Sequence, residues 1–184
     1  MTRTEIINEY LDMLGNEFYL EIGTANGNNF VLVNAKHKVG CDVRARDLNG
    51  IIPMSSNDFF RFWPKTIKFD VIFIDGDHSY EQSLKDLIGA VQILNPDGAI
   101  VLHDCLPNKV EETGETKDDK SPWYGNVYKT LIWARQRLHT VCHEDDCGCG
   151  VVVPDRPIED FPVIPKDYTF DDYLKHKKEW MGVL

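Results

Sequence analysis

Carboxylates and imidazoles follow two apolar runs in the segment 70–105. The runs are residues 71–74 and 99–102, and the polar set is Asp75, Asp77, His78, His103 and Asp104. An amphipathic helical pattern lies between the runs, which predicts a β-α-β unit. Because ligands in open α/β sheets bind outside the carboxyl ends of the strands, we expect these side chains at a binding or catalytic site.

A glycine-containing turn, EIGTANG at residues 21–27, precedes this unit and joins a predicted strand to a predicted helix. Glycine lets the backbone turn sharply and approach a ligand closely, and the helix start offers free N–H groups. Glu21 ends a buried strand, where a carboxylate needs a partner. Asp42 ends the next strand, where an acid commonly holds ribose hydroxyls in nucleotide-binding sheets.

Hydrophobic periodicity predicts strands that alternate with helices. The predicted strands are 18–22, 38–43, 50–54, 70–75 and 99–103, with a closing hairpin at Val141 and 150–153. The predicted helices are 4–14, 28–34, 55–62, one from Ser79 to about 94, 123–138 and 170–180. This order predicts one α/β domain over residues 1–184, with a mostly parallel sheet, helices on both faces and an antiparallel edge hairpin.

Local signals refine this outline. Ser79 and Gln82 fit a capping box, and Asn-Pro-Asp-Gly at 95–98 predicts a turn. Residues 106–121 are polar and charged, and they suit either a lid over the site or a solvated loop. A tail rich in Pro and Asp follows at 155–184.

The composition disfavours several classes of protein. The formal net charge of -10 disfavours nucleic acid as a partner. No apolar run approaches the roughly 20 residues of a membrane span, and the first residues lack the apolar core of a signal peptide. Five irregularly spaced cysteines disfavour a disulfide framework, so we expect a cytoplasmic protein. A homo-oligomer is compatible with the sequence.

The order of these motifs resembles class I S-adenosylmethionine-dependent methyltransferases. The pattern is ExGxxxG, an acid after strand two, SxD after strand three, FIDGDHSYEQSLKDL, and PDGAIVLHD, over roughly residues 17–155. It looks like the small IDGxH branch that includes macrolide sugar and catechol O-methyltransferases. The resemblance implies a Rossmann-like methyltransferase fold and O-methylation of a small hydroxylated acceptor, sugar-like or phenolic.

The resemblance also implies residue roles. Asp75 and Asp104 match carboxylates that bind a divalent cation such as Mg²⁺ in the metal-dependent relatives, and His78 matches the general base. Asp42 matches the ribose ligand. The remaining cofactor positions are Glu21, Gly23, Thr24, Ala25 and Gly27 around the amino acid part of S-adenosylmethionine, and Ser56, Asn57 and Asp58 along the adenine.

The chain departs from the family pattern beside Asp104. Catechol-type enzymes follow that acid with Asn, where this chain has Cys105, and sugar-type relatives can precede it with an acid, where this chain has His103. His103 therefore stands as the candidate third metal ligand beside Asp75 and Asp104, or as a core histidine.

Other interpretations stay open at this stage. Asp77 suits a turn or a helix cap better than a ligand. The Cys142–Cys149 cluster suits a turn between the last two strands, because its spacing does not match a zinc site. Trp123 and Tyr124 suit an acceptor wall or the core equally. A non-catalytic nucleotide-binding module is the alternative function, and an NAD-dependent oxidoreductase is disfavoured by the glycine spacing.

Overall fold

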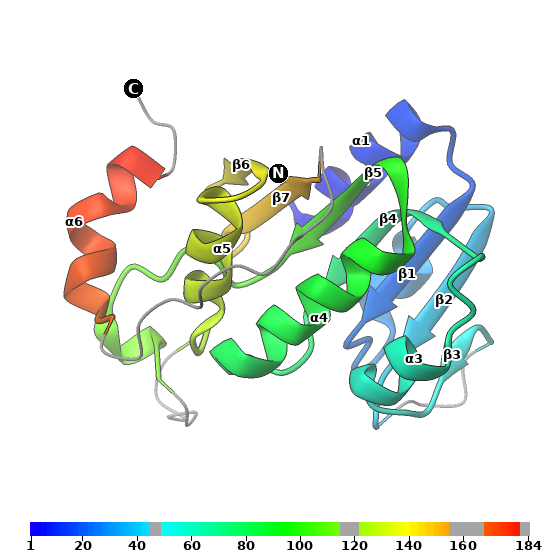
Figure 1. Ribbon diagram of the computed structural model, residues 1–184, viewed down its shortest axis with the longest axis horizontal. Helices are drawn as coiled ribbons and strands as arrows, with labels where there is room; N and C mark the ends of the chain where they lie inside the picture. Colours follow the sequence, from blue (N-terminus) through cyan, green and yellow to red (C-terminus); the bar gives the residue numbers. More distant parts are fainter. Residues whose placement is uncertain (45–48, 115–121, 155–167, 181–184) are drawn as a thin grey trace.

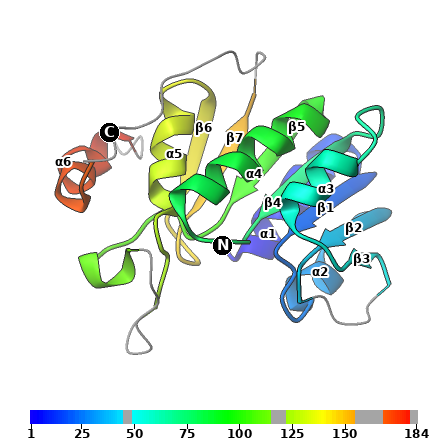
Figure 2. The same cartoon turned by 60° about the horizontal axis from the view of Figure 1, so that its bottom comes forward.

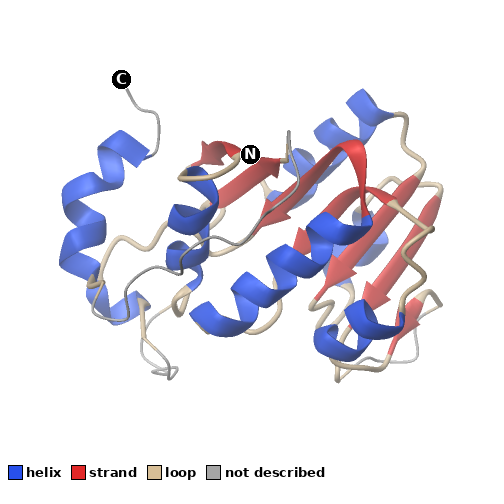
Figure 3. Cartoon of the chain, viewed as in Figure 1, coloured by secondary structure: helices blue, strands red, loops and turns tan. Residues whose placement is uncertain are grey.

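The computed structural model describes residues 1–44, 49–114, 122–154 and 168–180 of the 184-residue chain. The described residues form a seven-stranded sheet with helices on both faces (Figures 1 and 3). The strands are β1 Phe18–Ile22, β2 His37–Cys41, β3 Ile51–Ile52, β4 Phe69–Ile74, β5 Leu94–Leu102, β6 His139–His143 and β7 Cys149–Val153. The helices are α1 Arg3–Leu14, α2 Asn28–Leu32, α3 Ser56–Phe62, α4 Tyr80–Ile93, η1 Val110–Glu112 (a short 3₁₀ helix), α5 Val127–Arg135 and α6 Phe170–Trp180.

The strand order is β3-β2-β1-β4-β5-β7-β6, and all pairs from β3 to β5 are parallel. Strand β7 is antiparallel to both β5 and β6. The mostly parallel sheet with an antiparallel edge hairpin is therefore confirmed. The order reverses between β1 and β4, and such a switch point is where α/β sheets bind ligands.

Side chains along the strands point alternately to the two faces of the sheet, so each face has its own hydrophobic core. Ile72 and Ile74 of β4 face α3, α4 and α5, whereas Val71 and Phe73 face α1 and α2. Figure 2 shows α3 to α5 on one face of the sheet and α1 and α2 on the other. Burial on both faces explains why the central strands read as continuous apolar runs.

The turn after β1 crosses the end of β4 at close range. Gly23 has φ +85°, and a Cβ at this position would collide with the backbone carbonyl of Asp75. The amide of Asp75 donates to the carbonyl of Ile22 (2.8 Å), which continues the ladder to the strand ends. This contact alone requires glycine at position 23, whether or not a ligand binds the turn.

Three element predictions need correction. Strand β5 begins at Leu94, because residues 95–98 bulge out between the pairs Phe69–Leu94 and Val71–Ala99 rather than forming a turn before the strand. Strand β2 ends at Cys41, so Asp42 follows it. Helix α5 begins at Val127 instead of 123, since Gly125 holds a left-handed conformation just before it.

The predicted helix caps are partly confirmed. Ser79 caps α4 by accepting from the amide of Gln82 (3.3 Å). The Gln82 side chain does not complete the box; its amide donates instead to Asp86 (2.8 Å) and to Ser56 (3.1 Å). The hydrogen bond from Gln82 to Ser56 links α4 to the start of α3.

The segment 106–121 falls partly outside the described residues, which stop at 114 and resume at 122. In the described part, Glu112 is buried and accepts from the amide of Asn108 (2.7 Å). The amide of Tyr124 donates to the carbonyl of Glu112 (2.7 Å). The start of this segment is therefore bonded to the chain that leads into α5, while its role as a lid stays a prediction.

We expect Gly23→Ala to destabilise the fold by more than about 3 kcal/mol, because it adds a backbone collision to the roughly 1 kcal/mol cost of a left-handed Ala. Gly15→Ala is the matched control, since Gly15 has φ +94° but an added Cβ there would meet no atom within 4 Å. Urea unfolding measures both. If both variants lost the same free energy of unfolding, the collision at Gly23 would not be the cause.

Candidate active site

The carboxyl ends of β1, β2, β4 and β5 meet at one edge of the sheet, and residues at the ends of β1, β2 and β4 line a cleft of about 790 Å³. Residues from both predicted half-sites line this cleft. Those from the cofactor set are Gly23, Ala25, Asp42, Ser56 and Asn57, and those from the chemical set are Asp75, Asp77 and His78. Cleft residues outside these sets include Met54, Gln82 and Trp123.

Asp42 is fixed beside the glycine turn. Its carboxylate accepts from the amide of Ala25 (2.7 Å) and from the amide of Arg44 (2.6 Å). Ala25 itself is left-handed, with φ +45°. An unusual backbone conformation in a non-glycine residue often marks a ligand-binding turn.

The other predicted cofactor residues shape the glycine turn itself and the start of α3. Thr24 is buried and its carbonyl accepts from the amide of Gly27 (2.7 Å). Gly27 precedes α2 with φ +75°. Asp58 bonds to the hydroxyl of Ser55 (2.8 Å), which caps α3.

Glu21 is 1% exposed and lies beneath the turn. Its carboxylate accepts from the hydroxyl of Tyr19 (2.6 Å) and from the side-chain amide of Asn29 (2.8 Å). Burial raises the pKa of Glu21 to about 7, and the two hydrogen bonds offset part of that rise. The sequence-based expectation that this carboxylate needs partners is met by two neutral donors.

Asp75 and His78 line the chemical half of the cleft, and Asp104 lies beside His78. The Nε2 atom of His78 lies 3.5 Å from Asp75 and 3.4 Å from Asp104. One possible ligand atom from each of the three lies within 4.8 Å of the others. Although burial works against it, the two carboxylates raise the pKa of His78.

His103 lies behind this group and is 3% exposed. Its Nδ1 atom is 3.2 Å from Asp104 and 3.5 Å from Asp75. Burial lowers the pKa of His103, but the two carboxylates outweigh that effect and raise it to about 9. Burial likewise works to raise the pKa of Asp75, yet His103, His78 and Arg3 hold it well below its usual range.

Sequence reasoning missed Arg3 and Asp146. The guanidinium of Arg3 donates to Asp75 (2.9 Å) and, through two nitrogens, to Asp146 (3.0 and 3.1 Å). The backbone amide of Arg3 also donates to Asp146 (2.7 Å). Neither residue lies in a motif: Arg3 begins α1, and Asp146 lies in the turn between β6 and β7, so only the fold brings them to the strand ends.

Trp123 covers His78 from the cleft side. Their rings stack with centroids 4.9 Å apart and planes 16° apart. Gly125 permits this approach, because a Cβ there would meet the Cβ of His78 at 2.5 Å. Trp123 is thus at the site, whereas Tyr128 packs in the core against Phe170 and Tyr173.

Asp77 accepts from the amide of Ser79 (2.8 Å), which is the turn contact that the sequence predicts for it. Cys105 is fully buried in the core.

The donors around Asp75 and Asp104 do not suit Mg²⁺. This ion requires oxygen ligands in a near-octahedral arrangement. One oxygen of Asp75 is taken by Arg3, and the remaining neighbours of both carboxylates are the imidazoles of His78 and His103. No amide oxygen stands at position 105, where the side chain is a buried thiol.

Comparisons with known proteins agree with this architecture. Residues 20–105 match the family model described as a methyltransferase domain. No curated protein matches the sequence.

Solved structures share the fold at low sequence identity. A protein titled a putative caffeoyl-CoA O-methyltransferase from Staphylococcus aureus has a TM-score of 0.61 and 18% identity, with 81% of each chain covered. An O-methyltransferase from Bacillus cereus, solved with SAH, has a TM-score of 0.54 and 18% identity, covering 82% of this chain and 80% of that one. The MycE methyltransferase, solved with Mg, SAH and mycinamycin VI, has a TM-score of 0.55 and 19% identity; the match covers 88% of this chain and 51% of MycE.

The fold is therefore the Rossmann-like methyltransferase fold predicted from the sequence. Residues 20–105 thus match a methyltransferase domain, in a chain whose sheet and helices have the methyltransferase fold. Within the described residues, no helix has the length and apolar character needed to cross a membrane.

Glu21 gives a pH-dependent prediction. The carboxyl group of Glu21 loses its proton near pH 4.5 in the unfolded chain and near pH 7 in the folded chain. Ionisation of this group therefore lowers the free energy of unfolding as the pH rises between these values. Glu21→Gln keeps an acceptor for Tyr19 and Asn29. We expect it to stabilise the protein by about 2 to 3 kcal/mol at pH 8 and to be neutral at pH 4.

Urea unfolding at the two pH values measures this difference. Glu17→Gln is the control, because Glu17 forms only a surface pair with Lys36 and should change stability little at either pH. A Glu21→Gln effect that is the same at pH 4 and pH 8 would show that the buried carboxyl is not the cause.

Proposed function

We propose that the protein transfers the methyl group of S-adenosylmethionine to a hydroxyl oxygen of a small acceptor, sugar-like or phenolic. The observation that carries the proposal is one cleft lined by both half-sites, with Gly23, Ala25 and Asp42 on one side and Asp75 and His78 on the other. Structural neighbours titled O-methyltransferases support the same reaction.

The cofactor would occupy the β1–β2 side of the cleft. The carboxylate of Asp42 suits the two ribose hydroxyls. Ser56 and Asn57 of α3 suit the adenine, and Gln82 of α4 is held beside them by its bond to Asn57 (3.2 Å). The glycine turn leaves room for the amino acid part, and Glu21 beneath it adds negative charge that favours the cationic cofactor.

The acceptor would lie in the cleft beside Asp75, His78 and Trp123. The sulfonium is already activated, so the chain must mainly align the acceptor oxygen with the methyl carbon and remove a proton. As the new C–O bond forms and the C–S bond breaks, the hydroxyl proton passes to Nε2 of His78. Asp75 and Asp104, 3.5 and 3.4 Å from that atom, stabilise the imidazolium. No step passes through Mg²⁺.

Asp42→Ala should weaken binding of S-adenosylhomocysteine by 10- to 100-fold, because it removes charge-assisted hydrogen bonds to the ribose. Calorimetry on the purified protein measures the affinity. Asp97→Ala is the control, since Asp97 lies in the bulge at the opposite edge of the sheet. Unchanged affinity in Asp42→Ala would place the ribose elsewhere.

His78→Gln should lower kcat by roughly 10²- to 10⁴-fold, the usual contribution of a general base. Cofactor affinity should stay within about threefold, because His78 acts on the acceptor. His139→Gln, on the exposed edge strand β6, is the control. Release of S-adenosylhomocysteine with panels of sugars and catechols measures turnover.

The same assay separates the alternative of a non-catalytic binding module. That alternative expects cofactor binding with no turnover on any acceptor, and no functional effect of His78→Gln. Turnover that is insensitive to His78→Gln would refute the role of the base while leaving the reaction class intact.

A further inference from the structure

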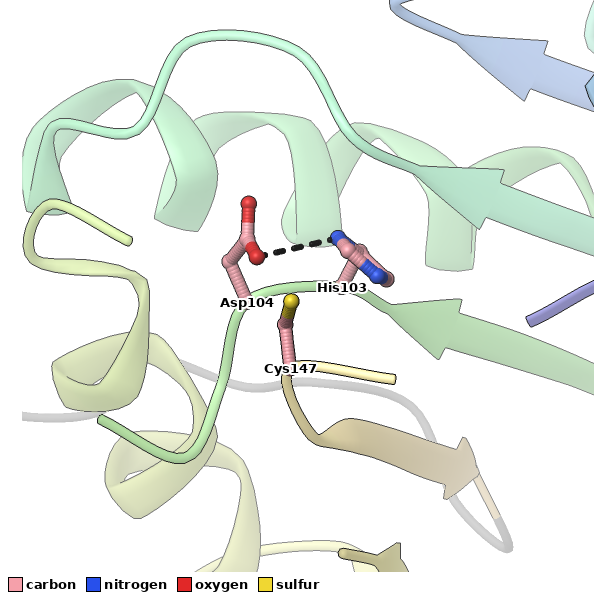
Figure 4. A group of neighbouring side chains, drawn as sticks. All are labelled: His103, Asp104 and Cys147. Carbon is pink, nitrogen blue, oxygen red and sulfur yellow. Dashed lines mark ion pairs between the residues drawn. The ribbon is translucent and has the colours of Figure 1, made fainter. Parts of the chain in front are cut away.

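A polar cluster lies beside the acceptor half of the cleft and, apart from Asp104, has no part in the proposed methyl transfer. It consists of His103 and Asp104, at the end of β5, and Cys147, in the turn before β7. One nitrogen, oxygen or sulfur atom from each lies within 4.8 Å of the others. Figure 4 shows the three side chains directed toward a common space.

His103 is the buried donor in this cluster. It is 3% exposed, and neither ring nitrogen forms a regular hydrogen bond in the described part of the chain. Leaving buried polar atoms without a partner is costly, so such a group indicates an absent ligand or an ionic role. Its Nδ1 lies 3.2 Å from Asp104, close to the about 3.3 Å that separates two nitrogen or oxygen ligands of one tetrahedral zinc ion.

The local charges favour a cation. Three carboxylates converge here, because Asp146 lies 3.7 Å from Nε2 of His103 and Asp75 lies 3.5 Å from its Nδ1. Arg3 supplies one permanent positive charge to Asp75 and Asp146. The remaining carboxylate charge faces the imidazoles of His78 and His103, and a divalent ion bound to His103 would take the place of its proton.

Cys147 differs from the other four cysteines, all of which also lie in described residues. Cys41, Cys105 and Cys149 are buried in the two hydrophobic cores. Cys142 is half-buried and lies 3.5 Å from the guanidinium of Arg135. Only the sulfur of Cys147 joins a histidine and a carboxylate at ligand spacing.

We propose that His103, Asp104 and Cys147 bind a divalent transition-metal ion of the zinc type. Imidazole, carboxylate and thiolate together suit Zn²⁺ and Co²⁺, whereas Mg²⁺ takes oxygen ligands. On binding, the thiol proton of Cys147 and the imidazolium proton of His103 pass to solvent, and the sulfur and a ring nitrogen each donate an electron pair to the ion. Three protein ligands leave a fourth position for water, and the ion ties the end of β5 to the β6–β7 turn.

The test is titration of the chelator-treated full chain with Co²⁺, followed by absorption spectroscopy, and with Zn²⁺ in competition with a chromophoric chelator. The expected result is one ion per chain with a thiolate-to-cobalt charge-transfer band, unaffected by excess Mg²⁺. Cys147→Ala should lose the band and weaken Zn²⁺ binding by about a hundredfold or more. His103→Gln should also weaken binding.

Cys142→Ala is the matched control and should keep the band and the affinity. Circular dichroism of each metal-free variant establishes that it is folded. Wild-type protein that takes up no Co²⁺ would overturn the proposal and would leave protonated histidines to balance the carboxylates. A band that survives in Cys147→Ala, or that disappears in Cys142→Ala instead, would also overturn it. Since the readout is metal binding, these results are independent of methyl transfer.

Discussion

The convergence of Asp75, Asp104 and Asp146 at one edge of the sheet is the constraint on which the site depends. Carboxylates this close repel one another unless positive groups lie between them. Arg3 bridges Asp75 and Asp146, and the two imidazoles lie between Asp75 and Asp104. Because Arg3 belongs to α1, this helix must pack on the sheet for the charges of Asp75 and Asp146 to be balanced. Asp104 and Asp146 both have positive φ, a cost that the surrounding ion pairs help to offset.

The glycine turn couples this acidic edge to the cofactor side of the cleft. Gly23 passes directly over the carbonyl of Asp75, and the amide of Asp75 donates to the carbonyl of Ile22, so the ends of β1 and β4 are held together at close range. These two backbone contacts help to set the spacing between the two half-sites. Glu21, buried beneath the turn between Tyr19 and Asn29, is a carboxyl group that costs stability at neutral pH. Under the proposed function, the positive charge of the bound cofactor would offset the cost of this buried carboxylate.

The strands and most helices could be predicted because burial on both faces leaves continuous apolar runs, and caps such as Ser79 mark helix starts. The strand-end residues Asp75, His78 and Asp104 could be predicted to meet for the same reason, since parallel strands end at one edge. Arg3, Asp146 and Cys147 could not, because they reach the site through the packing of α1 and the β6–β7 turn, which no local pattern specifies. The bulge at 95–98 could not be predicted either, since Pro and Gly indicate a turn equally well inside or before a strand.

Methyl transfer by this chain requires that the cleft between Asp42 and His78 hold the cofactor with its sulfur toward the acceptor half. A crystal structure of the complex with S-adenosylhomocysteine would show this placement directly. We expect the ribose hydroxyls on the carboxylate of Asp42, the adenine along Ser56 and Asn57, and the sulfur facing Asp75 and the stacked pair of His78 and Trp123. Cofactor density outside this cleft, or with the adenine and amino acid ends exchanged, would contradict the proposed function.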